Sequence, residues 1–482
     1  MAASLDAVPK DLYIGGAWLA AADGARSTVI DPATEETIAE VADAGVADAL
    51  AALRAADEAA ASWAAHPPRE RGEILRRAFE LLIAQREPIA RLITLESGKA
   101  LSEARAEAGY AAEFLRWYSE EAVRIPGEIA TAPSGGNRMI VLRQPVGVCV
   151  FITPWNFPAA MATRKIGPAL AAGCSVVLKP AKETPLTALA LAELFARAGV
   201  PPGVINVLPS RRSTQIVEAM LRDSRVRKLS FTGSTQVGRT LLAQAAAQII
   251  KCSMELGGNA PFLVFADADL DAAVTAAMVA KLRNGGESCT AANRFYVEAP
   301  VAAEFSRRFA TAMAAVKIGP GLEPGVQMGP LINASTRDKV AALVADARDR
   351  GGQILTGGRS PAGRGFFYEP TVISDVPRDA RVFHEEIFGP VAPIARFEGV
   401  DEAVALANAT EFGLVSFVHT RDLAKALRVA ERVESGMVGI NRGVVSDPAA
   451  PFGGWKQSGI GREGAHDGLL EYLQTKYIAA SW

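Results

Sequence analysis

From Val146 onward the sequence alternates short apolar runs with helix-like stretches, and this alternation limits the possible folds more than any other feature. The runs VGVCVFIT, SVVLKP, VINVLP and KLSFT are typical of strands, and they alternate with helical patterns at 159–172, about 187–198 and 235–249. Thr184 and Pro185 introduce the second helix as a capping residue followed by proline at the first helical position. Apolar strands alternating with helices predict a parallel, doubly wound α/β sheet.

A second alternation begins after ELGGNAP. It contains the strand-like run PFLVF, a helical pattern at 270–281, and the later runs RFYVE, QILTG and PIARF. The simplest boundary between two α/β units therefore lies near Leu256. Residues 125–145 differ from both units, because prolines and glycines precede the β-prone run MIVLR. We expect them to form an extended arm, with which the C-terminal run KYIAASW pairs as an edge strand.

Composition excludes several classes of protein. The 482 residues suit roughly two to four domains. Lys and Arg number 51 against 53 Asp and Glu, so a net charge of −2 provides no basic field for nucleic acid. No apolar run approaches the roughly 18–20 residues of a membrane span, and the start does not resemble a signal peptide. Four cysteines without a C-x-x-C pair, and four scattered histidines, argue against a disulfide scaffold or a zinc site. We expect a cytoplasmic protein with no metal, membrane or nucleic-acid partner.

One cysteine has an unusual setting. Cys289 lies in NGGESCT, among glycines, an acid and hydroxyls rather than apolar residues. A thiol on such a loop can act as a nucleophile, although most lone cysteines are small buried hydrophobes, and the residues alone favour neither interpretation. Cys149, Cys174 and Cys252 lie in strand patterns and are predicted to be structural.

Two further polar residues are candidates for chemistry. Glu255, in MELGGNAP, ends an apolar strand and should lie at the sheet edge where open α/β folds bind ligands. It is either a general base with a raised pKa or a capping or solvated acid. Asn156 lies between prolines in PWNFP, where it is either a turn residue or a rigid amide donor for an oxyanion.

Two segments point to a phosphate-bearing ligand. FTGSTQVG places Gly233 and Gly238 between a strand and a helix, whose first N–H groups can bind phosphate. KPAKETP places Lys179 and Lys182 just after a strand, where lysines favour the 2′-phosphate of NADP. The alternative for both lysines is a solvated charged loop.

Taken together, the segments PWNFP, KPAKETP, FTGSTQVG, MELGGNAP, NGGESC, EEIFGP and PFGGWKQSGIGRE resemble the aldehyde dehydrogenase superfamily, in order and over nearly the whole chain. Within it, AAMATRK, KLRNGGESC and GVVSDPAAPFGG are most similar to the bacterial succinate-semialdehyde dehydrogenases. The resemblance implies a Rossmann-like cofactor domain, an α/β catalytic domain and a small β oligomerisation arm. We assign residues 1–124 and 146–255 to the first, 256–450 to the second, and 125–145 with 470–482 to the arm, with 451–469 returning to the cofactor side.

The resemblance also implies roles for single residues. Cys289 matches the nucleophile, Glu255 the general base and Asn156 the oxyanion amide. Arg164, Arg283 and Ser446 match residues that hold a substrate carboxylate. The positions that match cofactor contacts are Thr153, Trp155, Lys179, Pro180, Ala181, Lys182, Gly233, Ser234, Leu256, Glu386 and Phe388.

The implied reaction is oxidation of succinic semialdehyde to succinate through a thiohemiacetal and a thioester on the cysteine. NADP is the expected cofactor and NAD a possible one, because Lys182 stands where NAD-preferring relatives often carry an acid. The small-molecule partner would be an aldehyde with a carboxylate, and the assembly a homodimer or homotetramer. The alternatives are a glutarate-semialdehyde or broad aliphatic aldehyde dehydrogenase and, ranked low, a non-catalytic binding protein.

The chain departs from the family pattern at three places. Glu287 replaces the usual Gln two residues before the nucleophile, and Thr290 follows the nucleophile, so no paired-cysteine switch is present. The turn PSRRST replaces a glycine-containing turn, and its Arg211 and Arg212 are predicted to add positive charge near the 2′-phosphate.

Overall fold

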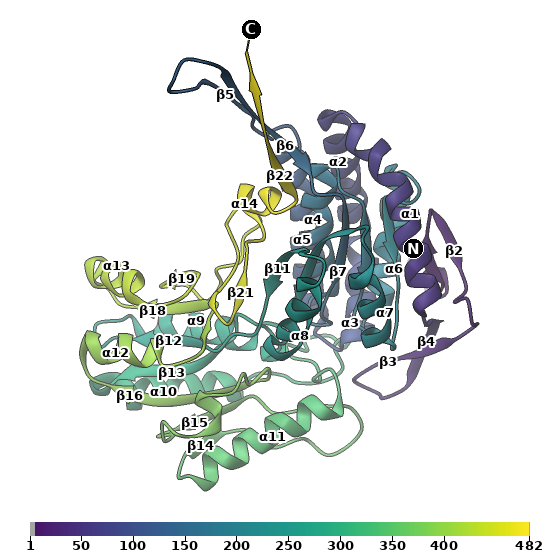
Figure 1. Ribbon diagram of the computed structural model, residues 1–482. Coiled ribbons are helices and arrows are strands. Elements are labelled where there is room, and N and C mark those ends of the chain that lie inside the picture. Colours follow the sequence, from purple (N-terminus) through teal and green to yellow (C-terminus); the bar gives the residue numbers. More distant parts are fainter. Residues whose placement is uncertain (1–4, 482) are drawn as a thin grey trace.

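The computed structural model describes residues 5–481. Five parallel strands form the centre of an eight-stranded sheet (Figure 1). Every residue of β7, β8 and β9 is buried, as expected for a parallel sheet covered on both faces. The strands run in the order β2 (Ala17–Leu19), β1 (Leu12–Ile14), β9 (Ile205–Val207), β8 (Val176–Lys179), β7 (Val148–Ile152), β10 (Val226–Thr232), β11 (Lys251–Glu255) and β21 (Gly459–Ile460).

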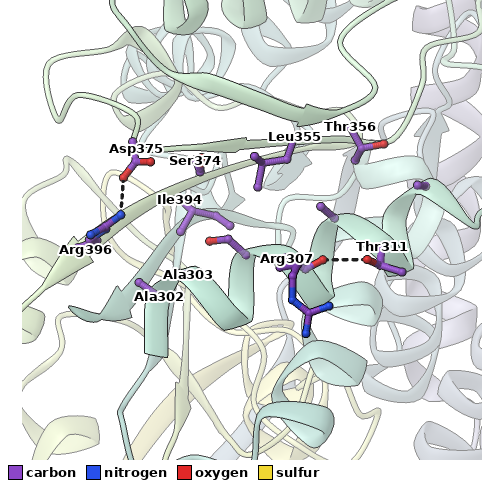
Figure 2. A pocket seen from close by; sticks show the side chains of 13 residues that line it. Ala302, Ala303, Arg307, Thr311, Leu355, Thr356, Ser374, Asp375, Ile394 and Arg396 are labelled. Atoms are coloured by element: carbon purple, nitrogen blue, oxygen red, sulfur yellow. Dashed lines mark hydrogen bonds and ion pairs between the residues drawn. The ribbon is translucent and has the colours of Figure 1, made fainter. Parts of the chain in front are cut away.

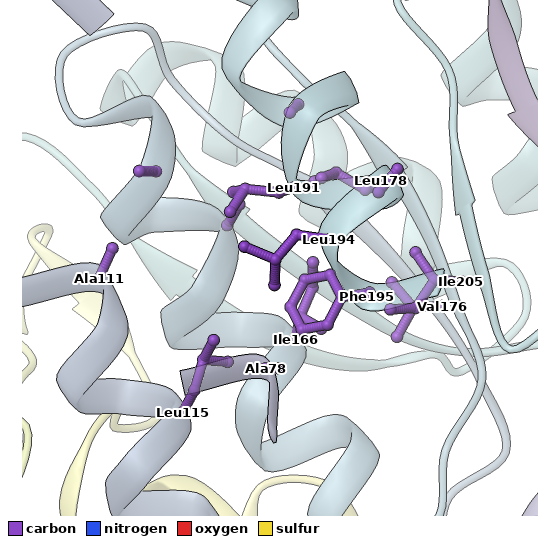
Figure 3. Close-up of a cluster of buried hydrophobic side chains, with 14 of the residues drawn as sticks. Ala78, Ala111, Leu115, Ile166, Val176, Leu178, Leu191, Leu194, Phe195 and Ile205 are labelled. Carbon is purple, nitrogen blue, oxygen red and sulfur yellow. The ribbon is translucent and has the colours of Figure 1, made fainter. Parts of the chain in front are cut away.

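Helices cover both faces of this sheet. Phe151 of β7 packs into one apolar cluster with α2, α4, α5 and α6, whereas Val150 packs into another with α1, α7 and α8. Figure 3 shows the first cluster, where Leu194 and Phe195 lie near Val176 and Ile205. The helices of this half are α1 (Val46–Ala65), α2 (Pro68–Ala84), α3 (Arg86–Ser97), α4 (Leu101–Glu121), α5 (Pro158–Ala172), α6 (Pro185–Ala198), α7 (Ser213–Arg222), α8 (Thr235–Ala246) and the C-terminal α14 (Ala465–Leu470).

A second, seven-stranded sheet begins after β11, at the lower left of Figure 1. Its strands are parallel except for β14, which pairs antiparallel with β15. They run in the order β14 (Gln353–Thr356), β15 (Thr371–Ser374), β16 (Val391–Phe397), β13 (Ala292–Glu298), β12 (Ala260–Val264), β18 (Val415–His419) and β19 (Met437–Ile440). Its helices are α9 (Leu270–Leu282), α10 (Ala299–Ala314), α11 (Ala334–Asp349), α12 (Gly399–Asn408) and α13 (Leu423–Arg432).

A three-stranded antiparallel arm projects from the body at the top of Figure 1. Its strands are β22 (Leu473–Ala480), β6 (Arg138–Pro145) and β5 (Glu128–Thr131). Leu473 pairs with Pro145 and Ala480 with Arg138, which confirms the predicted pairing of the C-terminal run with the arm. Two two-stranded antiparallel sheets complete the fold: β3 (Arg26–Ile30) with β4 (Thr37–Ala42), and β17 (Phe412–Gly413) with β20 (Trp455–Lys456). In residues 5–481, no helix combines the length and the apolarity that crossing a membrane requires.

The structure corrects two local expectations. Thr184 precedes α6, but its side chain makes no capping hydrogen bond. The carboxylate of Glu96, on α3, instead accepts from the N–H groups of Leu186 and Thr187 at 2.8 and 3.0 Å. A distant buried acid therefore replaces the local cap. The helix expected to reach 249 ends at Ala246, because Ile249 turns away with a φ of 52°.

Candidate active site

A cavity of about 230 Å³ opens where the carboxyl ends of the first sheet face the second half of the molecule. Eight of the predicted residues line it together, namely Trp155, Asn156, Gly233, Ser234, Leu256, Cys289, Glu386 and Phe388. The other lining residues are Pro154, Met161, Thr232, Gly257, Thr336 and Lys339. Segments far apart in the sequence therefore converge on one site.

Cys289 follows a sharp turn that begins where α9 ends. Asn284 and Gly285 have φ values of 56° and 62°, so the chain leaves the helix abruptly and presents the thiol to the cavity. Gly258 permits a close approach, because a Cβ atom there would lie 2.2 Å from the carbonyl oxygen of Cys289. Burial raises the pKa of the thiol to about 12, and the Arg164 guanidinium opposes this rise. The resting side chain is therefore a neutral thiol.

Asn156 is buried and firmly anchored. Its backbone carbonyl accepts hydrogen bonds from the Lys99 ammonium at 2.6 Å and the Asn284 amide at 3.0 Å. Lys99 is in turn paired with the carboxylate of Glu107 at 2.5 Å. The Asn156 side-chain amide donates to the carbonyl of Glu287 at 3.1 Å, whereas its Oδ1 atom is buried and has no hydrogen-bond partner among residues 5–481. Such anchoring gives a fixed donor beside the thiol.

Glu255 is the last residue of β11, at the predicted sheet edge, and is buried. In the described part of the chain, its Oε2 atom has no hydrogen-bond partner. Burial, with a contribution from the Glu463 carboxylate, raises the pKa of Glu255 well above its ordinary value. Glu463 itself forms an ion pair with Lys165 and lies 3.6 Å from Arg164, so its pKa is below the ordinary value although burial raises it. One carboxyl in this pair is thus neutral and the other ionised.

The cofactor-side residues surround the start of α8. The Ser234 hydroxyl accepts from the N–H of Val237 at 3.4 Å, which leaves the other first-turn N–H groups free for an anion. A Cβ atom on Gly233 would lie 2.4 Å from the ring of Phe231, so only glycine fits there. Across the cavity, Glu386 Oε1 accepts from the N–H of Gly258 at 3.0 Å, and burial raises the pKa of Glu386 to about 7. Free N–H groups and a carboxylate suit the phosphates and ribose of a dinucleotide.

Two aromatic residues and two lysines complete the predicted cofactor set. The rings of Trp155 and Phe388 meet edge to face, with centroids 5.4 Å apart. Lys179 ends β8 and is buried, which lowers its pKa to about 8. Lys182 is exposed and lies 3.8 Å from Glu183. Thr153, which donates from its backbone N–H to the carbonyl of Lys179, does not line the 230 Å³ cavity, nor do Lys179, Pro180, Ala181 and Lys182.

The PSRRST turn is held by the N-terminal region. Arg212 forms an ion pair with Asp23 and also contacts Asp43. The backbone N–H of Arg211 donates to Asp43 Oδ1 at 2.8 Å, while its side chain is exposed. Because its charge is already balanced, Arg212 does not supply the free cation that we predicted for a 2′-phosphate.

The three predicted substrate residues differ in how they are held. Arg164 is buried on α5 and donates to the Tyr110 hydroxyl at 2.5 Å. Arg283 is the C-terminal cap residue of α9 and is half-buried, and its guanidinium makes no hydrogen bond or ion pair within residues 5–481. Its guanidinium packs on the rings of Phe157 and Tyr110. Ser446 lies half-buried in the loop after β19, and its hydroxyl has no partner in the described part of the chain.

Four residues that hydrogen-bond to the site residues or to their neighbours were not predicted from the sequence: Lys99, Tyr110, Lys165 and Glu463. One feature of the sequence indicates that such partners exist. Arg164 and Lys165 are adjacent charges on a helix in which every residue is buried, and buried charges require partners. Glu463 supplies that partner from 298 residues further along the chain than Lys165.

A larger cavity of about 510 Å³ lies between α10 and strands β14 to β16 (Figure 2). Asp375 and Arg396 are paired with each other at 3.0 Å, and Thr311 donates to the carbonyl of Arg307. Size alone would favour this cavity, but the smaller one is lined by Cys289, by the buried Glu386 and by Gly233 and Ser234 at the start of α8, whereas Glu255 lies outside its lining. We therefore place the chemistry in the smaller cavity.

Comparisons with known proteins agree with this geometry. Residues 18–478 match the aldehyde dehydrogenase family. The chain is 55% identical over 441 residues to a succinate-semialdehyde dehydrogenase of Paenarthrobacter nicotinovorans, covering 92% of this chain and 98% of the relative. It is 50% identical over 469 residues to a glutarate-semialdehyde dehydrogenase of Pseudomonas aeruginosa, covering 97% of each. A crystal structure described as an E. coli NADP-dependent enzyme superposes with a TM-score of 0.98 at 46% identity, covering both chains completely.

Proposed function

Because this chain belongs to the aldehyde dehydrogenase family, we propose that it is an oxidoreductase that converts succinic semialdehyde to succinate with NADP as the preferred cofactor. One observation carries the choice of substrate. Burial raises the pKa of the Cys289 thiol, and the Arg283 guanidinium lies close enough to oppose that rise slightly, yet it has no anionic partner within residues 5–481. A half-buried cation without a counter-ion favours a substrate that brings a carboxylate.

Cys289 is the proposed nucleophile. Its thiol loses a proton to solvent before or during attack, its sulfur forms a bond to the aldehyde carbon, and the carbonyl electron pair moves to oxygen. In this proposal, the Asn156 amide, which lines the same cavity as Cys289, and the backbone N–H of Cys289 stabilise the resulting oxyanion. The thiohemiacetal carbon would then lose a hydride to a bound nicotinamide, which leaves a thioester. Glu255, after losing its own proton to solvent, takes a proton from the water that cleaves this thioester and releases the acid. Its raised pKa makes the ionised carboxylate a stronger base than an exposed glutamate.

The cofactor residues fit a dinucleotide. The N–H groups at the start of α8, next to Gly233, would hold phosphate, and Glu386 would accept hydrogen bonds from ribose hydroxyls. The bound nicotinamide would supply the hydride acceptor. Lys182 favours NADP over NAD, because its exposed ammonium has only a loose contact with Glu183 at 3.8 Å. NAD remains a second, weaker cofactor in this proposal.

A second substrate has specific support. The chain is as long as, and 50% identical to, a relative that acts on glutarate semialdehyde. That aldehyde is one methylene longer, and a single methylene changes binding by only about 1–3 kcal/mol. We expect it to be oxidised more slowly than succinic semialdehyde.

The arm favours assembly of the chain into a homodimer or homotetramer. It exposes apolar side chains on an isolated sheet, including Ile129, whose relative solvent exposure is 75%, and Tyr477, whose relative solvent exposure is 57%. The edges of β5 and β22 also lack a neighbouring strand within the described residues. We assign residues 125–145 and 470–482 to this oligomerisation arm and keep the division between the two α/β domains at residue 256.

Absorbance of the reduced cofactor tests the proposed function directly. Initial rates should be measured with succinic semialdehyde, glutarate semialdehyde and butanal, each with NADP and with NAD. The proposal expects the highest kcat/KM for succinic semialdehyde with NADP. Butanal oxidised as efficiently as succinic semialdehyde would contradict the carboxylate-binding site, while leaving the family chemistry intact.

A further inference from the structure

Tyr110, on α4, contacts both arginines of the proposed substrate site. Its hydroxyl accepts a hydrogen bond from Arg164 at 2.5 Å, and the Cζ atom of Arg164 lies 5.7 Å from the centre of its ring. The Cζ atom of Arg283 lies 5.6 Å from the same ring centre. The two arginines belong to α5 and to the end of α9, so this tyrosine ring is a point where three helices meet at the site.

The two arginines are not equivalent. Arg164 is 2% exposed, lies 3.6 Å from the Glu463 carboxylate, and stacks 4.2 Å from the ring of Phe452. The Arg283 guanidinium has ring contacts but no hydrogen bond or ion pair within residues 5–481, and it lies 4.9 Å from the ring centre of Phe157. Rings stabilise a guanidinium without occupying its N–H groups. The donors of Arg283 therefore remain available to an anion, whereas one terminal nitrogen of Arg164 donates to Tyr110 and the other faces Glu463.

The Tyr110 hydroxyl adds a neutral donor. Its oxygen accepts from Arg164, and its own hydrogen has no acceptor within residues 5–481. A carboxylate can accept about four hydrogen bonds on its two oxygens. Arg283 and the Tyr110 hydroxyl together offer donors of the number and kind that a carboxylate uses.

We propose that Tyr110 determines specificity for the substrate carboxylate, its ring supporting Arg283 and Arg164 and its hydroxyl donating to a carboxylate oxygen. This inference rests on the proposed function. No covalent step is assigned to Tyr110, and an uncharged aldehyde gains nothing from its hydroxyl.

The test compares Tyr110→Phe and Tyr110→Leu with the wild type on succinic semialdehyde and on butanal, at saturating NADP. Tyr110→Phe keeps the ring and removes the hydroxyl, so KM for succinic semialdehyde should rise about tenfold, and kcat/KM for butanal should stay within about twofold. Tyr110→Leu also removes the support of the arginines and should raise that KM further. Tyr13→Phe, which changes a tyrosine on β1, is the matched control and should change KM and kcat/KM for neither substrate.

The outcomes separate two failures. A wild-type enzyme without preference for succinic semialdehyde over butanal overturns the proposed function and this inference with it. A wild-type preference that Tyr110→Phe retains in full overturns only the role of Tyr110. An equal loss of kcat/KM on both aldehydes in Tyr110→Phe also overturns the role of Tyr110, because it indicates a general packing role rather than recognition of the carboxylate. If Tyr110→Leu does not fold, as judged by circular dichroism, Tyr110→Phe alone decides the result.

Discussion

The side-chain amide of Asn156 donates to the backbone carbonyl of Glu287 at 3.1 Å. The amide that we assign to the oxyanion is thus held by the residue two positions before the nucleophile. Asn284 donates to the same carbonyl at 3.0 Å, and the Glu287 carboxyl accepts from the N–H of Ile332 at 3.0 Å. Any displacement of this carbonyl would move the oxyanion donor relative to Cys289, so one short segment preorganises both groups.

Replacing Cys289 with Ala should abolish dehydrogenase activity while the protein stays folded. Loss of a covalent nucleophile typically costs several orders of magnitude in kcat. Cys252→Ala, which removes another partly exposed thiol on β11, should retain full activity. Initial rates of both variants, with circular dichroism to confirm folding, provide the measurement. Turnover of Cys289→Ala near the wild-type value would exclude the covalent mechanism.

The reactivity of the Cys289 thiol should depend steeply on pH in the cofactor-free protein. Because burial raises its pKa to about 12, only a small fraction is thiolate at neutral pH, and that fraction rises about tenfold per pH unit below the pKa. The rate of alkylation by iodoacetamide should therefore increase throughout the range from about pH 7 to 10. Subtracting the rate of Cys289→Ala isolates this thiol. A plateau near neutral pH would mean that the resting side chain is already ionised.

Glu287 should make stability depend on pH. Burial raises its pKa to about 8, above the ordinary value of 4.5. Between these two values the unfolded chain has lost the proton and the folded chain keeps it, so stability falls as pH rises through this window. Glu287→Gln cannot ionise but can still accept from Ile332. Its Tm should therefore exceed that of the wild type by more at about pH 8 than at about pH 6.

The control for this comparison is Glu431→Gln, which changes an exposed glutamate on α13 that has no ion pair within the described residues. Its Tm difference from the wild type should be the same at both pH values. A constant difference for Glu287→Gln as well would show that Glu287 is not protonated in the folded protein.

The sequence predicted features that depend on neighbours along the chain and missed those that depend on distant ones. Glu255 was placed correctly at the end of a strand, because apolar strand patterns locate the carboxyl edge of a parallel sheet. Thr184 was assigned the cap of α6 from local chemistry, whereas the capping carboxylate is that of Glu96. The ion pair between Lys165 and Glu463 spans 298 positions, so no local pattern reveals which acid meets which base.

Lys182 should decide the preference for NADP. Lys182→Glu removes an exposed cation and adds an anion, so kcat/KM with NADP should fall at least about tenfold, whereas kcat/KM with NAD should fall little or rise. Arg212→Ala is the informative control, because Arg212 is already paired with Asp23 and should not affect cofactor choice. Equal losses with both cofactors for Lys182→Glu would indicate that the lysine does not contact the 2′-phosphate.

Arg283 should distinguish charged from uncharged aldehydes. Its guanidinium has no polar partner within residues 5–481, so Arg283→Ala removes no counter-ion from a buried acid, whereas a change at Arg164 would remove one of the two cations beside Glu463. KM for succinic semialdehyde should therefore rise by roughly one to two orders of magnitude, the cost of losing a charge-assisted hydrogen bond, while butanal is oxidised almost as before. Arg54→Ala, at an exposed arginine on α1, should change neither value. If Arg283→Ala lowered kcat/KM equally for both aldehydes, the arginine would be supporting the Cys289 turn rather than binding the carboxylate, and the choice of substrate would lose its main physical basis.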